Sequence, residues 1–151
     1  MKALQNLIKK LERTSTKLDK VAMKAILDNK AFVLSTLKND QLGEGLDSFG
    51  RLVGEYAAST QEVYAKRSPK PRRAKDYGAS YNFEWTGKFM DSMKIKKEGN
   101  DGYVIDSARK AELESIYDTK LTALTEENND FVNNKVVNPA LYDSIFKSLL
   151  P

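Results

Sequence analysis

Hydrophobic and polar residues follow two different periods along the chain, and these periods predict its helices and strands. Over residues 1–30, apolar positions recur at alternating steps of four and three, which is typical of a helix with one apolar stripe. From residue 92 the period shortens to two, because Met93 and Ile95 alternate with lysines before a glycine-containing turn and a second apolar run. The sequence therefore predicts a long N-terminal helix and a β-hairpin near residues 92–107.

The stripe of the N-terminal helix is wide but broken by small and polar residues. Its positions are Leu4, Ile8, Leu11, Ser15, Leu18, Ala22, Ala25, Asn29 and Phe32. Serine, alanine and asparagine at seam positions make this a weak zipper for an isolated pair of helices. The pattern fits a helix that packs on its own domain, and it also fits a helix that contacts a neighbouring subunit.

Shorter patterns fill the rest of the chain. β-branched and aromatic residues predict a strand at 31–37, and RLVGEYA predicts a second extended piece at 51–57. Short helices are predicted at 58–66 and 108–117, the latter capped by Ser107, and Thr125 is a possible cap further on. A terminal amphipathic helix is predicted with Asn138 as its cap and Pro139 at its first position. The expected fold is α+β, in one domain spanning 1–151 with a small, mainly antiparallel sheet.

The segment WTGKFMDSMKI, residues 85–95, predicts a structural joint at the entry to the hairpin. Thr86 is a potential cap, Gly87 permits an unusual backbone angle, and Trp85 and Phe89 are potential anchors of the turn. Before the joint, Tyr81, Phe83 and Trp85 alternate, which predicts an extended segment with one face on the core. Pro139 and these joint residues are therefore assigned structural roles.

The amino-acid composition excludes several classes of function. The 151 residues include no histidine and no cysteine, so imidazole bases, thiolate nucleophiles and the usual zinc ligands are excluded. We expect no enzyme activity, no cofactor, no metal and no small-molecule substrate. No apolar run is long enough to span a bilayer, and charges interrupt the leucines near the start, so neither a membrane protein nor a signal peptide is expected.

Charge is unevenly distributed. Residues 66–80 form a basic loop, predicted to be flexible, which contains Lys66, Arg67, Lys70, Arg72, Arg73 and Lys75. Acidic residues gather later, at Glu112, Glu114, Asp118, Glu126, Glu127 and Asp130. The basic loop could be a solvated arm, could meet an acidic protein surface, or could bind nucleic acid with Tyr77 and Tyr81 stacking on bases. Both charged sets are candidate partner-binding residues.

Five segments in order resemble a known group of proteins. QLGEGLDSFGRLVGEYAAST, WTGKFMDSMKI, VIDSARKAELESIY, LTALTEEN and NPALYDSIF are similar to segments of small virion proteins of tailed phages and prophages, particularly from Bacteroidetes hosts. The likeness is to head-tail joining and tail-completion proteins and covers roughly residues 32–146. Asp118 follows Tyr117 at a point where that group often has glycine after the tyrosine.

The resemblance implies a function as well as a fold. It implies a small α+β domain that forms a ring in the neck of the particle, between the portal and the tail. The implied partners are copies of the chain and neighbouring connector, portal or tail proteins, with possible contact to the DNA in the channel. The implied location is the virion, assembled in the host cytoplasm. The alternative function is a nucleic-acid-binding accessory protein that uses the basic loop.

Overall fold

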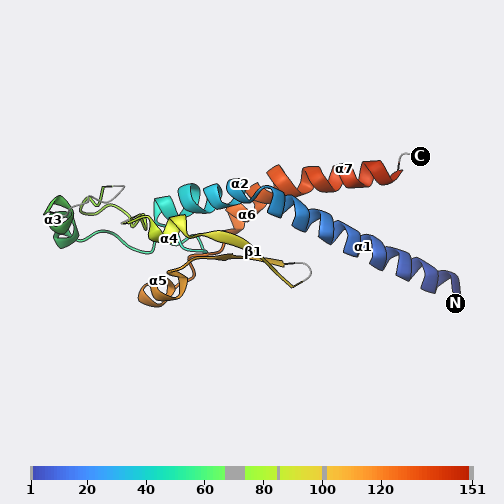
Figure 1. Ribbon diagram of the computed structural model, residues 1–151, viewed down its shortest axis with the longest axis horizontal. Coiled ribbons are helices and arrows are strands. Elements are labelled where there is room, and N and C mark those ends of the chain that lie inside the picture. The colour runs from blue at the N-terminus through green and yellow to red at the C-terminus, as the bar shows by residue number, and fades with distance from the viewer. Residues whose placement is uncertain (1, 67–73, 85, 100–101, 150–151) are drawn as a thin grey trace.

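The molecule is elongated, with helices that extend from a central body in opposite directions (Figure 1). The structure is a computed structural model that describes residues 2–66, 74–84, 86–99 and 102–149. Helices α1 (Lys2–Asp28) and α7 (Asn138–Leu149) extend on one side of the body, and α3 (Ala58–Lys66) lies on the other. The predicted α+β class is confirmed, since helices surround a small antiparallel sheet.

The first helical run continues further than predicted. A kink at Asn29, whose Nδ2 donates to the carbonyl oxygen of Ala25 at 2.9 Å, joins α1 to α2 (Lys30–Ser35). The π-helix η1 (Thr36–Gln41) and the 3-10 helix η2 (Leu42–Glu44) follow without a gap. The strand predicted at 31–37 is therefore wrong. The buried side chains there are Val33, Thr36, Leu37 and Gln41, and this spacing is that of a helix face, which overrides the β propensity.

A second helical run closes the chain. It consists of α6 (Glu126–Val132), the π-helix η3 (Asn133–Val137) and α7. Thr125 caps α6, as its Oγ1 accepts from the backbone N–H of Asn128 at 3.2 Å. The prediction that Asn138 caps a new helix is wrong, because its backbone is helical and its N–H donates to Asn133. Pro139 thus lies inside the run, and the wider π turn before it relieves the clash that its ring would cause with the preceding turn.

The hairpin is confirmed. Strands β1 (Lys94–Glu98) and β2 (Gly102–Asp106) pair antiparallel, with Ile95 opposite Ile105. The extended piece predicted at 51–57 forms only the isolated bridges Leu46↔Leu52 and Glu55↔Ser80 in the described part of the chain. Among the described residues, strand pairing is therefore limited to the hairpin and these two bridges.

Two short helices flank the hairpin. Helix α4 (Lys88–Asp91) leads into β1, and α5 (Lys110–Ile116) follows β2. Ser107 does not cap α5 with its side chain as predicted, because its Oγ donates to the carbonyl oxygen of Phe89 at 2.9 Å. The serine instead fastens the end of the hairpin to α4.

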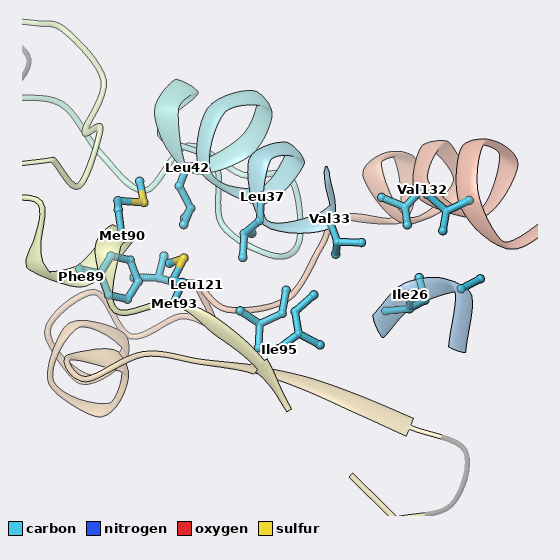
Figure 2. Close-up of a cluster of buried hydrophobic side chains, with 13 residues drawn as sticks. Ile26, Val33, Leu37, Leu42, Phe89, Met90, Met93, Ile95, Leu121 and Val132 are labelled. Carbon is cyan, nitrogen blue, oxygen red and sulfur yellow. The ribbon is translucent and has the colours of Figure 1, made fainter. Parts of the chain in front are cut away.

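The core lies between the helical runs and the hairpin. Figure 2 shows Ile95 facing Val33 and Leu37, while Phe89 and Met93 gather around Leu121 at one end of the cluster. Val132 and Ile26 continue the core towards α1 and α7 (Figure 2). Helix α2 contacts β1 directly, and α6 contacts η1. One continuous apolar cluster therefore joins α1, α2, η1, the hairpin and the second helical run.

Most of α1 lies outside this core. Leu4 and Ile8 are 63% and 47% exposed, and the first buried side chain in the described part of the helix is Met23. We call residues 2–20 the arm; it extends about 30 Å at the rise of an α-helix. The root of α1 thus packs on its own body, as one reading of the stripe predicted, while Leu4 and Ile8 of the arm are uncovered and Leu18 is half-buried.

Candidate interaction surfaces

An acidic hollow is the clearest candidate binding surface in the described part of the chain. It has a volume of about 740 Å³ and is lined by Asp40, Leu46, Phe49, Gly50, Thr125, Glu126, Glu127, Asn128 and Asp130. All four carboxylates belong to exposed residues, and the ring of Phe49 is 64% exposed. The hollow therefore combines an apolar contact with four negative charges. Of the predicted acidic set, it brings together Glu126, Glu127 and Asp130.

Gln41 joins the two segments that form the hollow. This side chain is completely buried, and its Nε2 donates to the carbonyl oxygen of Ala123 at 2.8 Å. Its Oε1 accepts from the backbone N–H of Thr125 at 2.9 Å and from Asn128 at 3.3 Å. A buried amide with both ends satisfied fixes η1 against the start of α6. No sequence pattern indicates this residue, because it is a lone glutamine in a turn-rich region.

Asp47 shapes the other wall of the hollow. Its Oδ1 accepts from the backbone N–H groups of Phe49 and Arg51, at 2.8 and 2.9 Å. Its Oδ2 accepts from the Arg51 guanidinium and from Thr119 Oγ1, both at 2.8 Å. Burial raises the pKa of Asp47, but the hydrogen bonds from Arg51, Thr119 and Phe49 outweigh burial and leave the pKa below its ordinary value of 3.8. This turn holds Phe49 in its exposed position.

The other three predicted acidic residues do not join the hollow. Glu112 is exposed and pairs with Arg109 within α5. Glu114 connects two segments of its own chain, since its Oε1 accepts hydrogen bonds from the backbone N–H groups of Leu121 and Thr122 at 2.9 and 3.2 Å. Asp118 is exposed and has a positive φ of 49°. The prediction of one acidic surface over 112–130 is therefore corrected to the smaller set around the hollow, with Glu114 serving the fold.

The predicted basic loop is described only at its ends. Arg67, Lys70, Arg72 and Arg73 lie outside the described residues. Lys66 is exposed at the end of α3. Lys75 is completely buried, which contradicts its predicted place on a partner-binding surface. Other exposed basic residues lie on the arm, at Lys9, Arg13, Lys17 and Lys20, and on β1, at Lys94, Lys96 and Lys97.

Lys75 belongs to a small buried polar cluster. Its ammonium group donates to Asn82 Oδ1 and lies 4.9 Å from the centroid of the Tyr56 ring. The Tyr56 hydroxyl donates to the same Asn82 oxygen and accepts from the Asn82 N–H, each at 3.1 Å. Burial raises the pKa of Tyr56. This cluster fixes the segment after the basic loop against residue 56 and explains why the lysine is not available to a partner.

The two tyrosines that could stack on bases have different surroundings. Tyr77 is exposed. The Tyr81 ring packs against Tyr56 and Tyr117, with centroid distances of 4.9 and 5.4 Å. Phe83 also contacts Tyr117, but its φ of 52° breaks the regular extended segment predicted there. Tyr81 therefore belongs to an internal aromatic cluster.

The joint before the hairpin contains a left-handed glycine and a short helix. Gly87 has a φ of 77°, a left-handed conformation that favours glycine, and α4 starts at the next residue. Phe89 is buried, and its carbonyl oxygen accepts from both Ser92 and Ser107 at 3.0 and 2.9 Å. Thr86 Oγ1 accepts from the Lys88 N–H only at 3.4 Å, so it is a weak cap. Trp85 lies outside the described residues.

Within the described residues, no group of three or more acidic, histidine or cysteine side chains is arranged to hold a metal ion. None of the helices in this part of the chain has the length and apolar character needed to cross a membrane. Comparison of the chain with protein-family models, curated protein sequences and solved structures finds no match.

Proposed function

We propose that this chain is a structural subunit of a tailed-phage virion, which assembles with copies of itself into a ring at the neck between portal and tail. The observation that carries the assembly role is the arm. A helix of this length, with Leu4 and Ile8 uncovered, presents an apolar stripe that a lone subunit does not bury. Because short isolated helices are only marginally stable in water, a partner surface would stabilise the arm.

The placement of charge supports the same role. The arm carries exposed basic residues, and the acidic hollow lies on the body, between the start of α6 and the turn at Phe49. A ring needs two different patches that meet between successive copies. Opposite charge on two separate patches favours such head-to-tail contacts over contacts of like patches.

The proposed position between portal and tail rests on the resemblance to head-tail joining and tail-completion proteins. One backbone feature supports that resemblance. Asp118 adopts a left-handed conformation, with φ of 49°, at the position where the resembled proteins often have glycine. Glycine adopts this conformation without the steric cost that other residues incur. In this proposal the partners are copies of the chain and the adjoining connector, portal or tail proteins, with the virion channel DNA as a further contact.

Mass spectrometry of purified particles tests the proposal. We expect peptides of this chain at a fixed ratio to the major capsid protein, in particles that survive a density gradient and a high-salt wash. Disruption of the gene should give filled heads that lack tails, and supply of the intact chain from a plasmid should restore infectivity. Absence from washed particles, or normal tailed particles without the chain, would reject the virion role.

A further inference from the structure

We infer that the arm of one copy docks into the acidic hollow of a second copy, in a head-to-tail contact. This inference rests on the proposed function, since it names the contact by which subunits would assemble. In this contact the arm, and not the basic loop, is the main partner of the acidic residues. Three observations carry it: the composition of the arm, the composition of the hollow, and the direction in which the arm leaves the body.

The arm offers both apolar and basic groups. Leu4 and Ile8 lie one helical turn apart and are exposed, so they form an uncovered apolar edge. Residues 2–20 contain six basic residues against Glu12 and Asp19. Four of the basic residues, Lys9, Arg13, Lys17 and Lys20, are exposed in the described structure. An amphipathic helix with this composition binds most favourably to a surface that is both apolar and negative.

The hollow has the matching chemistry. Phe49 and Leu46 supply apolar contact, and Asp40, Glu126, Glu127 and Asp130 supply four carboxylates. Among the described residues, the lining of the hollow includes no basic side chain, and the nearby Arg51 guanidinium is paired with Asp47 and lies 4.9 Å from the centroid of the Phe49 ring. The Asp47 turn fixes the backbone at Phe49, so the point from which the exposed ring projects is set before a partner binds. The hollow is therefore a preformed receptor for a basic amphipathic helix.

Geometry and charge disfavour two simpler arrangements. The arm continues α1 away from the body (Figure 1), so it cannot reach the hollow of its own chain without a break in the helix. Two arms from different copies would each bring a net positive charge, so arm-to-arm pairing is opposed by repulsion. A contact between the arm and the hollow of a second copy meets neither obstacle. Because the two patches differ, the contact repeats from copy to copy.

Site-directed cross-linking tests this contact with the full chain. The sequence has no cysteine, so Ile8→Cys in one chain and Phe49→Cys in another each provide a single thiol. When the two variants are mixed and oxidised, we expect a covalent dimer of one arm variant and one hollow variant. The matched control replaces Phe49→Cys with Tyr77→Cys, which is also highly exposed but lies outside the hollow. The control mixture should give only background dimer.

Charge reversal provides a second, independent measurement. Arg13→Glu combined with Lys17→Glu should raise the Kd of self-association by about tenfold at low salt, because two attractive contacts become repulsive. The control, Lys88→Glu combined with Lys94→Glu, makes the same change in net charge at two exposed sites on α4 and β1. The control should leave the Kd within about twofold. Circular dichroism melts that match the unmodified chain would show that each variant is folded.

Each outcome supports or overturns the inference. Equal cross-linking of Ile8→Cys to Phe49→Cys and to Tyr77→Cys would overturn it, as would self-linking of Ile8→Cys alone, which would show arm-to-arm pairing. Equal effects of the two charge reversals would also overturn it. A chain present in washed virions without the cross-link would reject the contact and leave the virion role. The cross-link in a chain absent from virions would reject the virion role and leave the contact.

Discussion

At the scale of single residues, buried carboxylates and amides connect segments that are distant in sequence. Asp47 accepts hydrogen bonds from its own turn and from Thr119, and Gln41 joins η1 to the start of α6. Both residues are buried, and their hydrogen bonds hold the segments that carry Phe49 and Thr125 at the acidic hollow. The geometry of the hollow thus depends on a few polar contacts.

Asp47→Asn should lower stability in a pH-dependent way. The folded-state pKa of Asp47 is depressed, so the ionised carboxylate stabilises the fold above its unfolded pKa, and this contribution is lost as pH falls through the folded pKa. At pH 7 we expect a loss of about 1–2 kcal/mol, discounted for the exposure of Arg51. The difference between variant and unmodified chain should shrink below about pH 4.

Denaturant unfolding between pH 7 and pH 3 would measure this effect. Asp40→Asn is the matched control, because it makes the same chemical change at an exposed carboxylate in the same region. The control should be nearly neutral at every pH. A deficit in Asp47→Asn that stays constant down to pH 3 would show that the carboxylate charge is not what stabilises the turn.

At the scale of elements, the extended segment around Tyr81 packs closely on η2. A Cβ atom at Gly45 would lie 2.6 Å from the carbonyl oxygen of Tyr81 and 2.9 Å from the Cβ of Ser80. Gly45 also has a φ of 80°. This glycine is therefore required both by its backbone conformation and by the approach of the neighbouring segment.

Gly45→Ala and Gly78→Ala separate these two requirements. Gly78 has a similar φ of 77°, but no atom lies within 4 Å of a Cβ built there. We expect Gly78→Ala to cost about 1–2 kcal/mol for its left-handed backbone alone. Gly45→Ala should cost at least about 3 kcal/mol, because backbone atoms must also move. Thermal unfolding of both variants measures the difference, and equal losses would refute the close packing.

Sequence patterns predicted the elements with a clear period. The N-terminal helix, the hairpin and the terminal helix were all visible as repeats of apolar positions. Residues 31–37 were mistaken for a strand because β propensity was given more weight than the helical spacing of Val33 and Leu37. The site was only partly predictable: Glu126, Glu127 and Asp130 are neighbours in sequence, whereas Asp40 and Phe49 reach the hollow only through the fold. Lys75 was misplaced because its charge suggested exposure.

At the scale of the whole molecule, the fold divides into a packed body and an arm that is not part of its core. Deletion of residues 2–16 should change the unfolding free energy of the body by less than about 0.5 kcal/mol, because the described side chains there are exposed. The same deletion should abolish self-association. Chemical denaturation at low protein concentration and light scattering at high concentration measure the two effects separately.

Ile26→Ala is the contrasting variant for this prediction. Ile26 lies in the same helix but is only 4% exposed and belongs to the core. Its truncation to alanine should cost about 2–4 kcal/mol, by loss of buried surface and creation of a cavity. If deletion of the arm destabilised the body as much as Ile26→Ala, the arm would have to pack on its own subunit.

The second helical run has a mechanical consequence for assembly. It starts at the rim of the hollow with Glu126 and ends beside the root of the arm, where Ala140 and Ser144 lie with Val21 and Ala25 along one groove. The run is helical from end to end, so one continuous element connects the hollow to the root of the arm. If the arm docks in the hollow as proposed, the two contact surfaces of each subunit would therefore be joined by a single helical run.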